Sequence, residues 1–194
     1  MTADESELFP FEENEVTKAH HAFGTWDVHH DSWYEKDSVE KYFGEPQSLD
    51  EIICYSQWLQ SEGYKCIFEE ARRQKPYCGM ALNWCYCDPW PALATNSIVC
   101  YPADPKPAYY AVADSCRPAL ASARIPHFSW KAGENFEIEL FILNDGRNAL
   151  PAGEVNVYIE LDGQSYQLAV WKYDAVPANE NLRGPKAGAV LPNV

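Results

Sequence analysis

The sequence is short of basic side chains: 15 Lys and Arg stand against 29 Asp and Glu in 194 residues, a formal net charge of −14. Nucleic-acid-binding proteins neutralise phosphates with such side chains, and neither a basic stripe nor a phosphate-binding glycine loop is present. An apolar run of about twenty residues, as a membrane span requires, is also missing, and no signal peptide begins at Met1. The composition argues against nucleic-acid and membrane partners.

The sequence also lacks the cysteine spacing that is typical of metal sites, although it contains seven cysteines. Cys85 and Cys87 stand two apart, but no Cys-x-x-Cys and no second close pair completes a zinc site. An odd number of cysteines at helical or strand positions predicts buried free thiols, which favours a reducing, cytoplasmic compartment without fixing it. We expect neither a metal ion nor another cofactor.

One long helix is predicted over residues 49–74. The sequence Ser48-Leu49-Asp50-Glu51 is a capping box, and Arg72, Arg73 and Lys75 precede Pro76 at the other end, where basic side chains suit the helix dipole. Apolar residues recur every three or four positions between the two ends, which predicts a face packed against other structure. A shorter helix is expected from Pro107 to about Cys116.

After Pro118 the pattern changes to the alternation of strands. Four strands are expected over residues 119–125, 136–143, 154–161 and 165–171, and Asp162-Gly163 predicts a two-residue hairpin turn. The remaining tail contains Pro177, Pro185 and Pro192 together with Gly184 and Gly188, so it is expected to leave an open sheet edge unless other strands follow. An open edge favours self-association or aggregation.

The segment of most chemical interest is Asn83-Trp84-Cys85-Tyr86-Cys87-Asp88-Pro89-Trp90-Pro91. The preceding run, residues 79–84, is predicted to be a short buried strand that ends at a loop. Prolines on both sides of Trp90 would present its ring with little conformational entropy left to lose. Flat indole faces suit sugar rings, and Asn83 and Asp88 offer hydrogen bonds to hydroxyls. The alternative is that both tryptophans pack in the core.

The order of these motifs resembles the last barrel strand and following segment of family two glycoside hydrolases, in particular the β-mannosidase and exo-β-glucosaminidase branch. The matching runs are Trp84–Pro91, Asn96-Ser97-Ile98, Pro105-Lys106-Pro107-Ala108-Tyr109-Tyr110, Tyr42-Phe43-Gly44, residues 56–65 with Glu69, Arg72 and Arg73, and downstream Arg117-Pro118, Trp130, Gly133-Glu134 and Asn144-Asp145. They extend over nearly the whole chain. Cys85 and Cys87 depart from the pattern, because many relatives have Gln, Asn or Asp there.

The resemblance implies an α/β barrel fragment, residues 1–117, followed by an all-β immunoglobulin-like sandwich, residues 118–194, both incomplete. A whole (β/α)₈ barrel needs about 250 residues. It also implies part of a retaining glycosidase that hydrolyses β-mannosides, β-glucosaminides or similar β-linked sugars. Trp84 would form the floor of the sugar site, Trp90 would stack nearby, and Asn83 and Asp88 would bind hydroxyls. The rest of the barrel would be a partner.

The catalytic glutamates of such an enzyme are not expected in this chain. Retaining glycosidases use two carboxyl groups about 5 to 5.5 Å apart, and the resemblance places Met1 just after the strand that carries the second. Ser6-Glu7 lacks the apolar run expected before a nucleophile, and Asn14-Glu15, Glu134-Asn135 and Asn179-Glu180 lie outside barrel strands. The pairs His20-His21 and His29-His30 are expected at the barrel rim, with a sugar contact by His29 or His30 as an alternative.

A second hypothesis from another class is a non-catalytic β-sandwich module that binds carbohydrate or protein. In that case residues 1–116 would be a helical appendage, and sandwich aromatics such as Trp130 or Trp171 would contact the ligand. The two hypotheses differ in which tryptophan the ligand needs. The sequence fixes neither the sugar nor the oligomeric state.

Overall fold

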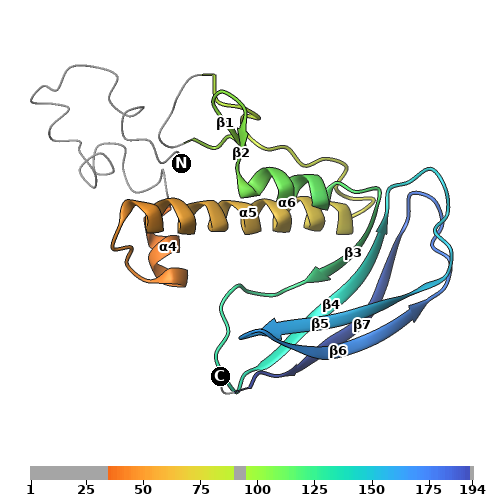
Figure 1. Cartoon of the computed structure of the whole chain (residues 1–194). Coiled ribbons are helices and arrows are strands. Elements are labelled where there is room, and N and C mark those ends of the chain that lie inside the picture. The colour runs from red at the N-terminus through yellow and green to blue at the C-terminus, as the bar shows by residue number, and fades with distance from the viewer. Residues whose placement is uncertain (1–34, 90–94, 193–194) are drawn as a thin grey trace, which may run out of the picture. The chain divides into compact units, whose positions relative to one another are not determined.

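The computed structural model describes residues 35–89 and 95–192, which divide into two compact units (Figure 1). One unit consists of residues up to Ile67 together with Ala81–Asp114, and the other of Phe68–Met80 together with Ser115–Val194. The division after residue 117 stays a prediction. The residue pairs Ser6-Glu7, Asn14-Glu15, His20-His21 and His29-His30 lie outside the described residues, as does Trp90.

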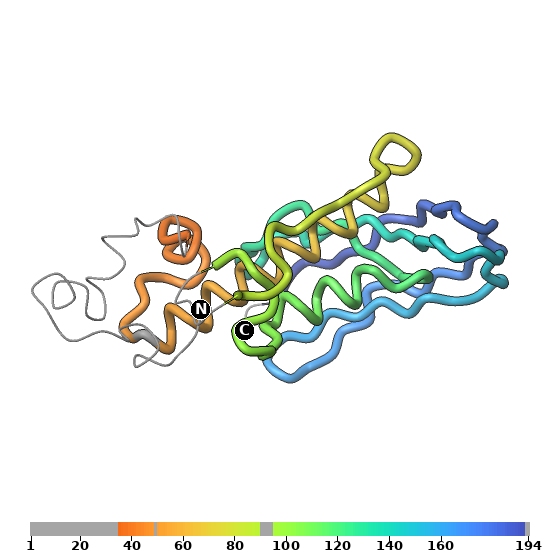
Figure 2. The backbone as a smooth tube through the Cα atoms, turned by 90° about the horizontal axis from the view of Figure 1, so that it is seen from above, coloured from red at the N-terminus to blue at the C-terminus, as the bar shows by residue number. Residues whose placement is uncertain are grey.

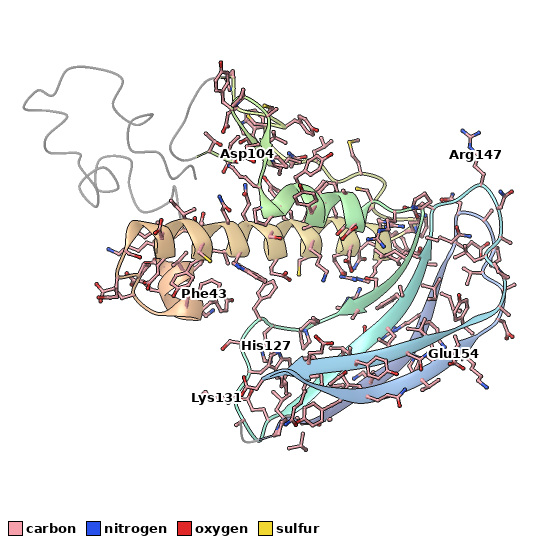
Figure 3. All side chains as sticks on the ribbon, viewed as in Figure 1. Phe43, Asp104, His127, Lys131, Arg147 and Glu154 are labelled. Atoms are coloured by element: carbon pink, nitrogen blue, oxygen red, sulfur yellow. The ribbon has the colours of Figure 1, made fainter. Side chains whose placement is uncertain are left out.

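The long helix is confirmed as α5, Leu49–Arg73. The backbone N–H of Glu51 donates to Ser48 Oγ at 3.2 Å, and Glu51 Oε2 accepts from the backbone N–H of Gln47 at 2.7 Å, so both sides of the predicted cap are used. A shorter helix, α4, spans Lys36–Phe43. Its last residue, labelled in Figure 3, stacks on Tyr55 of α5 with ring centroids 4.8 Å apart.

After α5 the chain turns and runs back along the helix in an extended form (Figures 1 and 2). The strand predicted over residues 79–84 is wrong: no regular strand forms there. Strands need a hydrogen-bonded neighbour, and the first pairing after α5 among the described residues is a parallel bridge between Cys87 and Val99. Strands β1, Val99–Cys100, and β2, Asp104–Pro105, follow as an antiparallel pair.

The shorter helix predicted after α5 is confirmed as α6, Pro107–Ser115. A small core lies beneath the loop that precedes it. Ile98, Val99 and Ala108 are buried together, and Tyr64 of α5 packs against them. This core fixes the position of the segment that carries the candidate sugar residues.

The C-terminal part is a β-sandwich of two antiparallel sheets (Figure 1). One sheet has the order β3-β4-β7, with β3 at Ala119–Arg124, β4 at Asn135–Asn144 and β7 at Asn181–Val190. The other pairs β5, Gly153–Leu161, with β6, Gln164–Tyr173. Asp162 and Gly163 have φ angles of 47° and 73°, which is the two-residue hairpin turn predicted from the sequence.

The tail forms strand β7, which was not among the four strands predicted from the sequence. Glycine and proline normally oppose strand formation, but here Pro185 lies at an irregularity in the β4–β7 register, where the pairing shifts between Glu139 and Phe141. A bulge of this kind leaves a residue without a ladder bond, so the missing N–H of proline costs little. A carbon added at Gly184 would lie 2.6 Å from the Trp171 ring, so glycine is required for the sheets to pack.

The end of α5 is joined to this sandwich by charged side chains. Arg73 donates to Glu70 Oε2 at 2.8 Å, and the Glu70 carboxylate also accepts from Arg124 of β3 at 2.7 and 3.0 Å. The guanidinium groups of Arg73 and Arg124 lie 5.7 and 5.1 Å from the ring centroid of Phe141. The aromatic face and the carboxylate therefore hold the two arginines between helix and sheet.

Candidate functional site

The candidate sugar loop, residues 83–89, is shaped by hydrogen bonds of its own. Asn83 Nδ2 donates to the carbonyl of Cys85 at 2.9 Å, and Cys85 has a left-handed backbone with φ of 64°. Side-chain amides commonly stabilise such a local turn. Asn83, predicted to bind a hydroxyl, therefore uses one amide hydrogen to hold the loop backbone.

The chain beyond this turn is anchored to the segment before α6. The carbonyl of Tyr86 accepts from the backbone N–H groups of Ile98 and Val99 at 3.2 and 3.0 Å, and the N–H of Asp88 donates to Val99 at 3.0 Å. These bonds hold one side of the loop to the small core. The other side is left to face solvent.

Trp84 is the large aromatic side chain on that solvent side, with 77% of its surface exposed. Tyr86 is 61% exposed, and its ring meets Tyr109 edge-on at 6.4 Å, which in turn meets Tyr110 at 5.3 Å. Core packing of Trp84 is therefore excluded in this structure. Exposed aromatic rings on an anchored backbone are the kind of surface that accepts the apolar face of a ligand.

Asp88 is buried, with 4% of its surface exposed. Its Oδ1 accepts a hydrogen bond from Thr95 Oγ1 at 2.7 Å. Its Oδ2 is buried and has no hydrogen-bond partner among the described residues. A buried carboxylate oxygen without a partner is costly, so this atom marks a place where a donor from outside these residues would be favourable.

Lys106 lies in the same cluster and is 3% exposed. Its Nζ donates to Thr95 Oγ1 and to the Thr95 carbonyl, both at 3.3 Å, and to Ser97 Oγ at 3.4 Å. The two hydroxyls are themselves 2.8 Å apart. Burial lowers the pKa of the Lys106 ammonium, while nearby Cys100 and Asp88 act in the opposite direction.

Two side chains of helix α5 hold the backbone of this cluster by hydrogen bonds. Gln60 Nε2 donates to the carbonyls of Asn96 and Ser97, both at 3.2 Å, and the Tyr64 hydroxyl donates to the Asn96 carbonyl at 3.1 Å. Burial raises the pKa of the Tyr64 phenol, and the nearby Cys85 thiol adds to the rise. The phenol therefore remains a donor across the neutral range.

The structure thus places three of the four predicted sugar residues, Asn83, Trp84 and Asp88, on one short loop, with different surroundings. Trp90 falls outside the described residues. Sequence reasoning did not assign Thr95, Ser97 or Lys106 to the site, although Lys106 stands between Pro105 and Pro107. A lysine between two prolines, within a run that resembles family two glycoside hydrolases, was the feature that could have indicated it.

The two tryptophans that would contact a ligand in the hypothesis of a non-catalytic binding module pack inward. Trp130 and Trp171 both lie against the sandwich core formed around Phe136, Ile138 and Leu140. The Nε1–H of Trp130 also donates to the carbonyl of His127 at 3.1 Å, and the indole stacks on the His127 imidazole. Figure 3 shows His127 in the loop after β3. Neither tryptophan resembles Trp84 in exposure.

The cysteines differ from their predicted burial. Cys100 is buried, as expected, and burial raises the pKa of its thiol. Cys54, Cys85 and Cys116 are exposed, so the prediction of buried thiols is wrong for these three. Among the described residues, no group of three or more His, Cys, Asp or Glu could hold a metal ion, and no helix is long and apolar enough to cross a membrane.

Comparison with known proteins gives matches to sugar-cleaving enzymes. The chain is 38% identical over 85 residues to β-mannosidase B of Aspergillus niger and 35% identical over 85 residues to β-mannosidase B of Aspergillus oryzae. Each match covers 42% of this chain and 10% of the relative. The chain thus matches about a tenth of the length of these relatives. No protein-family model matches.

Solved structures show a shared fold. The crystal structure of the Amycolatopsis orientalis exo-chitosanase CsxA has a TM-score of 0.55 to this chain at 22% identity, covering 81% of this chain and 18% of that one. A structure of the exo-β-D-glucosaminidase CsxA with a glucosamine-configured castanospermine gives the same values. This chain therefore resembles part of a family two glycoside hydrolase: its sequence is similar to a stretch of the β-mannosidases B, and it shares its fold with part of the exo-chitosanase CsxA.

Proposed function

We propose that this chain is part of a retaining β-glycosidase that hydrolyses β-mannosides, β-glucosaminides or similar β-linked sugars. Its segment supplies aromatic and polar contacts to the sugar but not the catalytic glutamates. The proposal is supported by the activities of the proteins it resembles, which are β-mannosidases and an exo-chitosanase. In the chain itself, the observation that carries it is the exposed ring of Trp84 on an anchored loop.

Each loop residue has a distinct part in the proposed site. The Trp84 ring, being exposed on a fixed backbone, stacks on the C–H face of the sugar at small entropic cost. Asp88 Oδ2, which has no partner among the described residues, accepts a hydrogen bond from a sugar hydroxyl, and Asn83 keeps the turn that presents the tryptophan. Trp90 is proposed to stack nearby, from outside the described residues.

The partner of the chain in this proposal is the remainder of the barrel. Leu82, Trp84 and Tyr86 are 79%, 77% and 61% exposed, and residues 79–84 have no neighbouring strand among the described residues. Large exposed apolar side chains in a row mark a surface that another element covers. Barrel strands from the rest of the enzyme would cover Leu82, complete the sugar site and bring the two glutamates. The sandwich would be its immunoglobulin-like domain.

The test is a titration of the chain with methyl β-D-mannoside and methyl β-D-glucosaminide, followed by NMR of the tryptophan indole protons. We expect a saturable shift of the Trp84 signal in the wild type, and in Trp84→Ala no saturable shift of the remaining indole signals. Because Trp84 is mostly exposed, this substitution should cost less than about 1 kcal/mol of folding free energy. The control Trp171→Ala removes a core contact and should cost about 3 kcal/mol or more.

Two results would contradict the proposal. Sugar binding that survives Trp84→Ala in a folded protein would remove the observation on which it stands. Hydrolysis of 4-nitrophenyl β-D-mannoside by the chain alone would show that it holds catalytic carboxyl groups of its own, since the reaction requires two.

A further inference from the structure

The buried polar cluster behind the loop consists of Asp88, Thr95, Ser97 and Lys106, and the proposed sugar contacts use only its first member. Lysine and aspartate are rarely this deeply buried unless they are paired. Here the two charged groups do not touch directly but share the hydroxyl of Thr95, which donates to Asp88 Oδ1 at 2.7 Å and lies 3.3 Å from Lys106 Nζ.

We infer that Lys106 is a positioning residue of the proposed sugar site, which holds the Asp88 carboxylate through Thr95 and Ser97 in the orientation in which Oδ2 accepts from a sugar hydroxyl. The inference rests on the proposed function for the sugar itself. Its geometric basis, the chain of contacts from Lys106 to Asp88, is independent of any ligand.

The direction of the hydrogen bonds supports this role. An ammonium group can only donate, so Lys106 occupies lone pairs on the Thr95 and Ser97 oxygens. The Thr95 hydroxyl proton is thereby left to point at Asp88 Oδ1. With Oδ1 satisfied in this way, the carboxylate has one fixed oxygen, and its buried Oδ2 still lacks a donor among the described residues.

Lys106 also secures the far side of the site. Its Nζ donates to the Thr95 carbonyl at 3.3 Å, and its backbone N–H donates to the carbonyl of Ile98 at 3.0 Å. Ile98 in turn donates to the Tyr86 carbonyl at 3.2 Å. One side chain and its backbone therefore connect the segment before α6 with both Asp88 and the aromatic part of the loop.

The experiment uses the 194-residue chain and four variants. Lys106→Met removes the charge at similar length, Lys106→Arg keeps the charge, and Thr95→Val removes the hydroxyl at similar shape. Lys172→Met, on an exposed lysine of β6 whose side chain is 83% accessible, is the matched control. Two quantities are measured: the NMR signals of the Asp88 carboxyl carbon and Thr95 amide without ligand, and the affinity for methyl β-D-mannoside.

In Lys106→Met we expect both NMR signals to move and the affinity to fall about tenfold, as for loss of a hydrogen bond to a charged group. Lys106→Arg should recover most of the affinity, and Lys172→Met should match the wild type. A folded Lys106→Met protein with unchanged Asp88 and Thr95 signals and unchanged affinity would overturn the inference.

The remaining outcomes are also decisive. If Lys106→Met does not fold, Thr95→Val replaces it, and an unmoved Asp88 signal in that variant would overturn the inference. If the wild type binds no sugar, the proposed function fails, whereas the signals of Asp88 and Thr95 still test the link from Lys106. If the signals move but sugar affinity does not, Lys106 is a structural residue and its positioning role is rejected.

Discussion

At the scale of single residues, Cys85 carries the backbone strain of the candidate sugar loop. Its φ of 64° lies in the left-handed region, which disfavours residues with a Cβ by about 1 to 2 kcal/mol. The strain is maintained because Asn83 donates to the Cys85 carbonyl and because Tyr86 is bonded to Ile98 and Val99. A strained residue between two exposed aromatics sets the direction in which the loop presents them.

Replacing Cys85 by glycine should therefore stabilise the protein by up to about 1 kcal/mol, because glycine adopts a left-handed backbone without penalty. The measurement is the urea dependence of unfolding. Cys87→Gly is the matched control: Cys87 forms the bridge with Val99 and its φ is not positive, so this change should destabilise by about 0.5 to 1 kcal/mol. Equal effects of the two substitutions would refute the assignment of strain to Cys85.

The sequence was enough to select the loop as a candidate site, but not to predict what surrounds each of its side chains. Tryptophan, asparagine and aspartate close to two prolines indicated a sugar surface, and Trp84 is indeed exposed. The hydrogen bond of Asn83 to its own loop and the link from Lys106 to Asp88 depend on tertiary packing. A buried lysine is an exception to the rule that lysines are solvated, so composition alone gives no reason to expect it.

At the scale of elements, the contact between the end of α5 and strand β3 depends on ionised carboxylates. Burial alone would raise the pKa of Glu70, but hydrogen bonds from Arg124, Arg73 and Gln74 outweigh it and lower the pKa from 4.5 to about 2. A carboxyl with a lower pKa in the folded state stabilises the fold above its unfolded pKa. That contribution is lost as the pH falls from about 4.5 towards 2.

Glu70→Gln should accordingly reduce stability at pH 7 and flatten the decline of stability between pH 4.5 and pH 2. The change should be measured as the urea midpoint at several pH values in this window. Glu160→Gln, at an exposed position of β5, is the control and should shift stability by less than about 0.5 kcal/mol. If Glu70→Gln and the wild type lose stability in parallel below pH 4.5, the ion pairs of Glu70 do not hold α5 to β3.

Strand β7 makes a second prediction at this scale. Gly184 lies under the Trp171 ring, and a carbon added there would come within 2.6 Å of it, so Gly184→Ala should cost about 1 to 3 kcal/mol through overpacking between the sheets. Gly63→Ala is the matched control, because nothing lies within 4 Å of that position. It is in the interior of α5, where alanine should gain about 0.5 to 1 kcal/mol. A neutral Gly184→Ala would contradict the packing.

The elements with a strong local signal were predictable, and those defined by neighbours were not. Helices α5 and α6 and strands β3 to β6 follow from caps, periodicity and a hairpin turn within each segment. Strand β7 contains Gly184, Pro185 and Gly188, which normally oppose a strand. They are tolerated here because of the packing of Trp171 and the shift in the β4–β7 register, and neither can be read from the β7 segment itself. Residues 79–84 show the converse, since a short apolar run without a paired neighbour forms no strand.

At the scale of the whole molecule, exposed apolar surface and net charge act against each other. Leu82, Trp84 and Tyr86 present large apolar side chains to solvent, which favours association. In the described residues β7 pairs with β4 on one side only, so an edge is open as well. A net charge of −14 at pH 7 opposes contact between copies, and salt screens that repulsion within about 10 Å at 0.1 M.

Self-association of the chain should therefore increase with salt at pH 7, and also as the pH approaches the isoelectric point of about 4.7. Sedimentation velocity at about 0.01 M and 1 M NaCl measures this, since the Debye length falls from about 30 Å to 3 Å between them. Leu82→Ser, at a side chain 79% exposed, should reduce the association at high salt. Lys172→Met, which leaves the loop unchanged, should not. Association that is strongest at low salt would instead show that copies meet through opposite charges and not through the apolar row at Leu82–Tyr86.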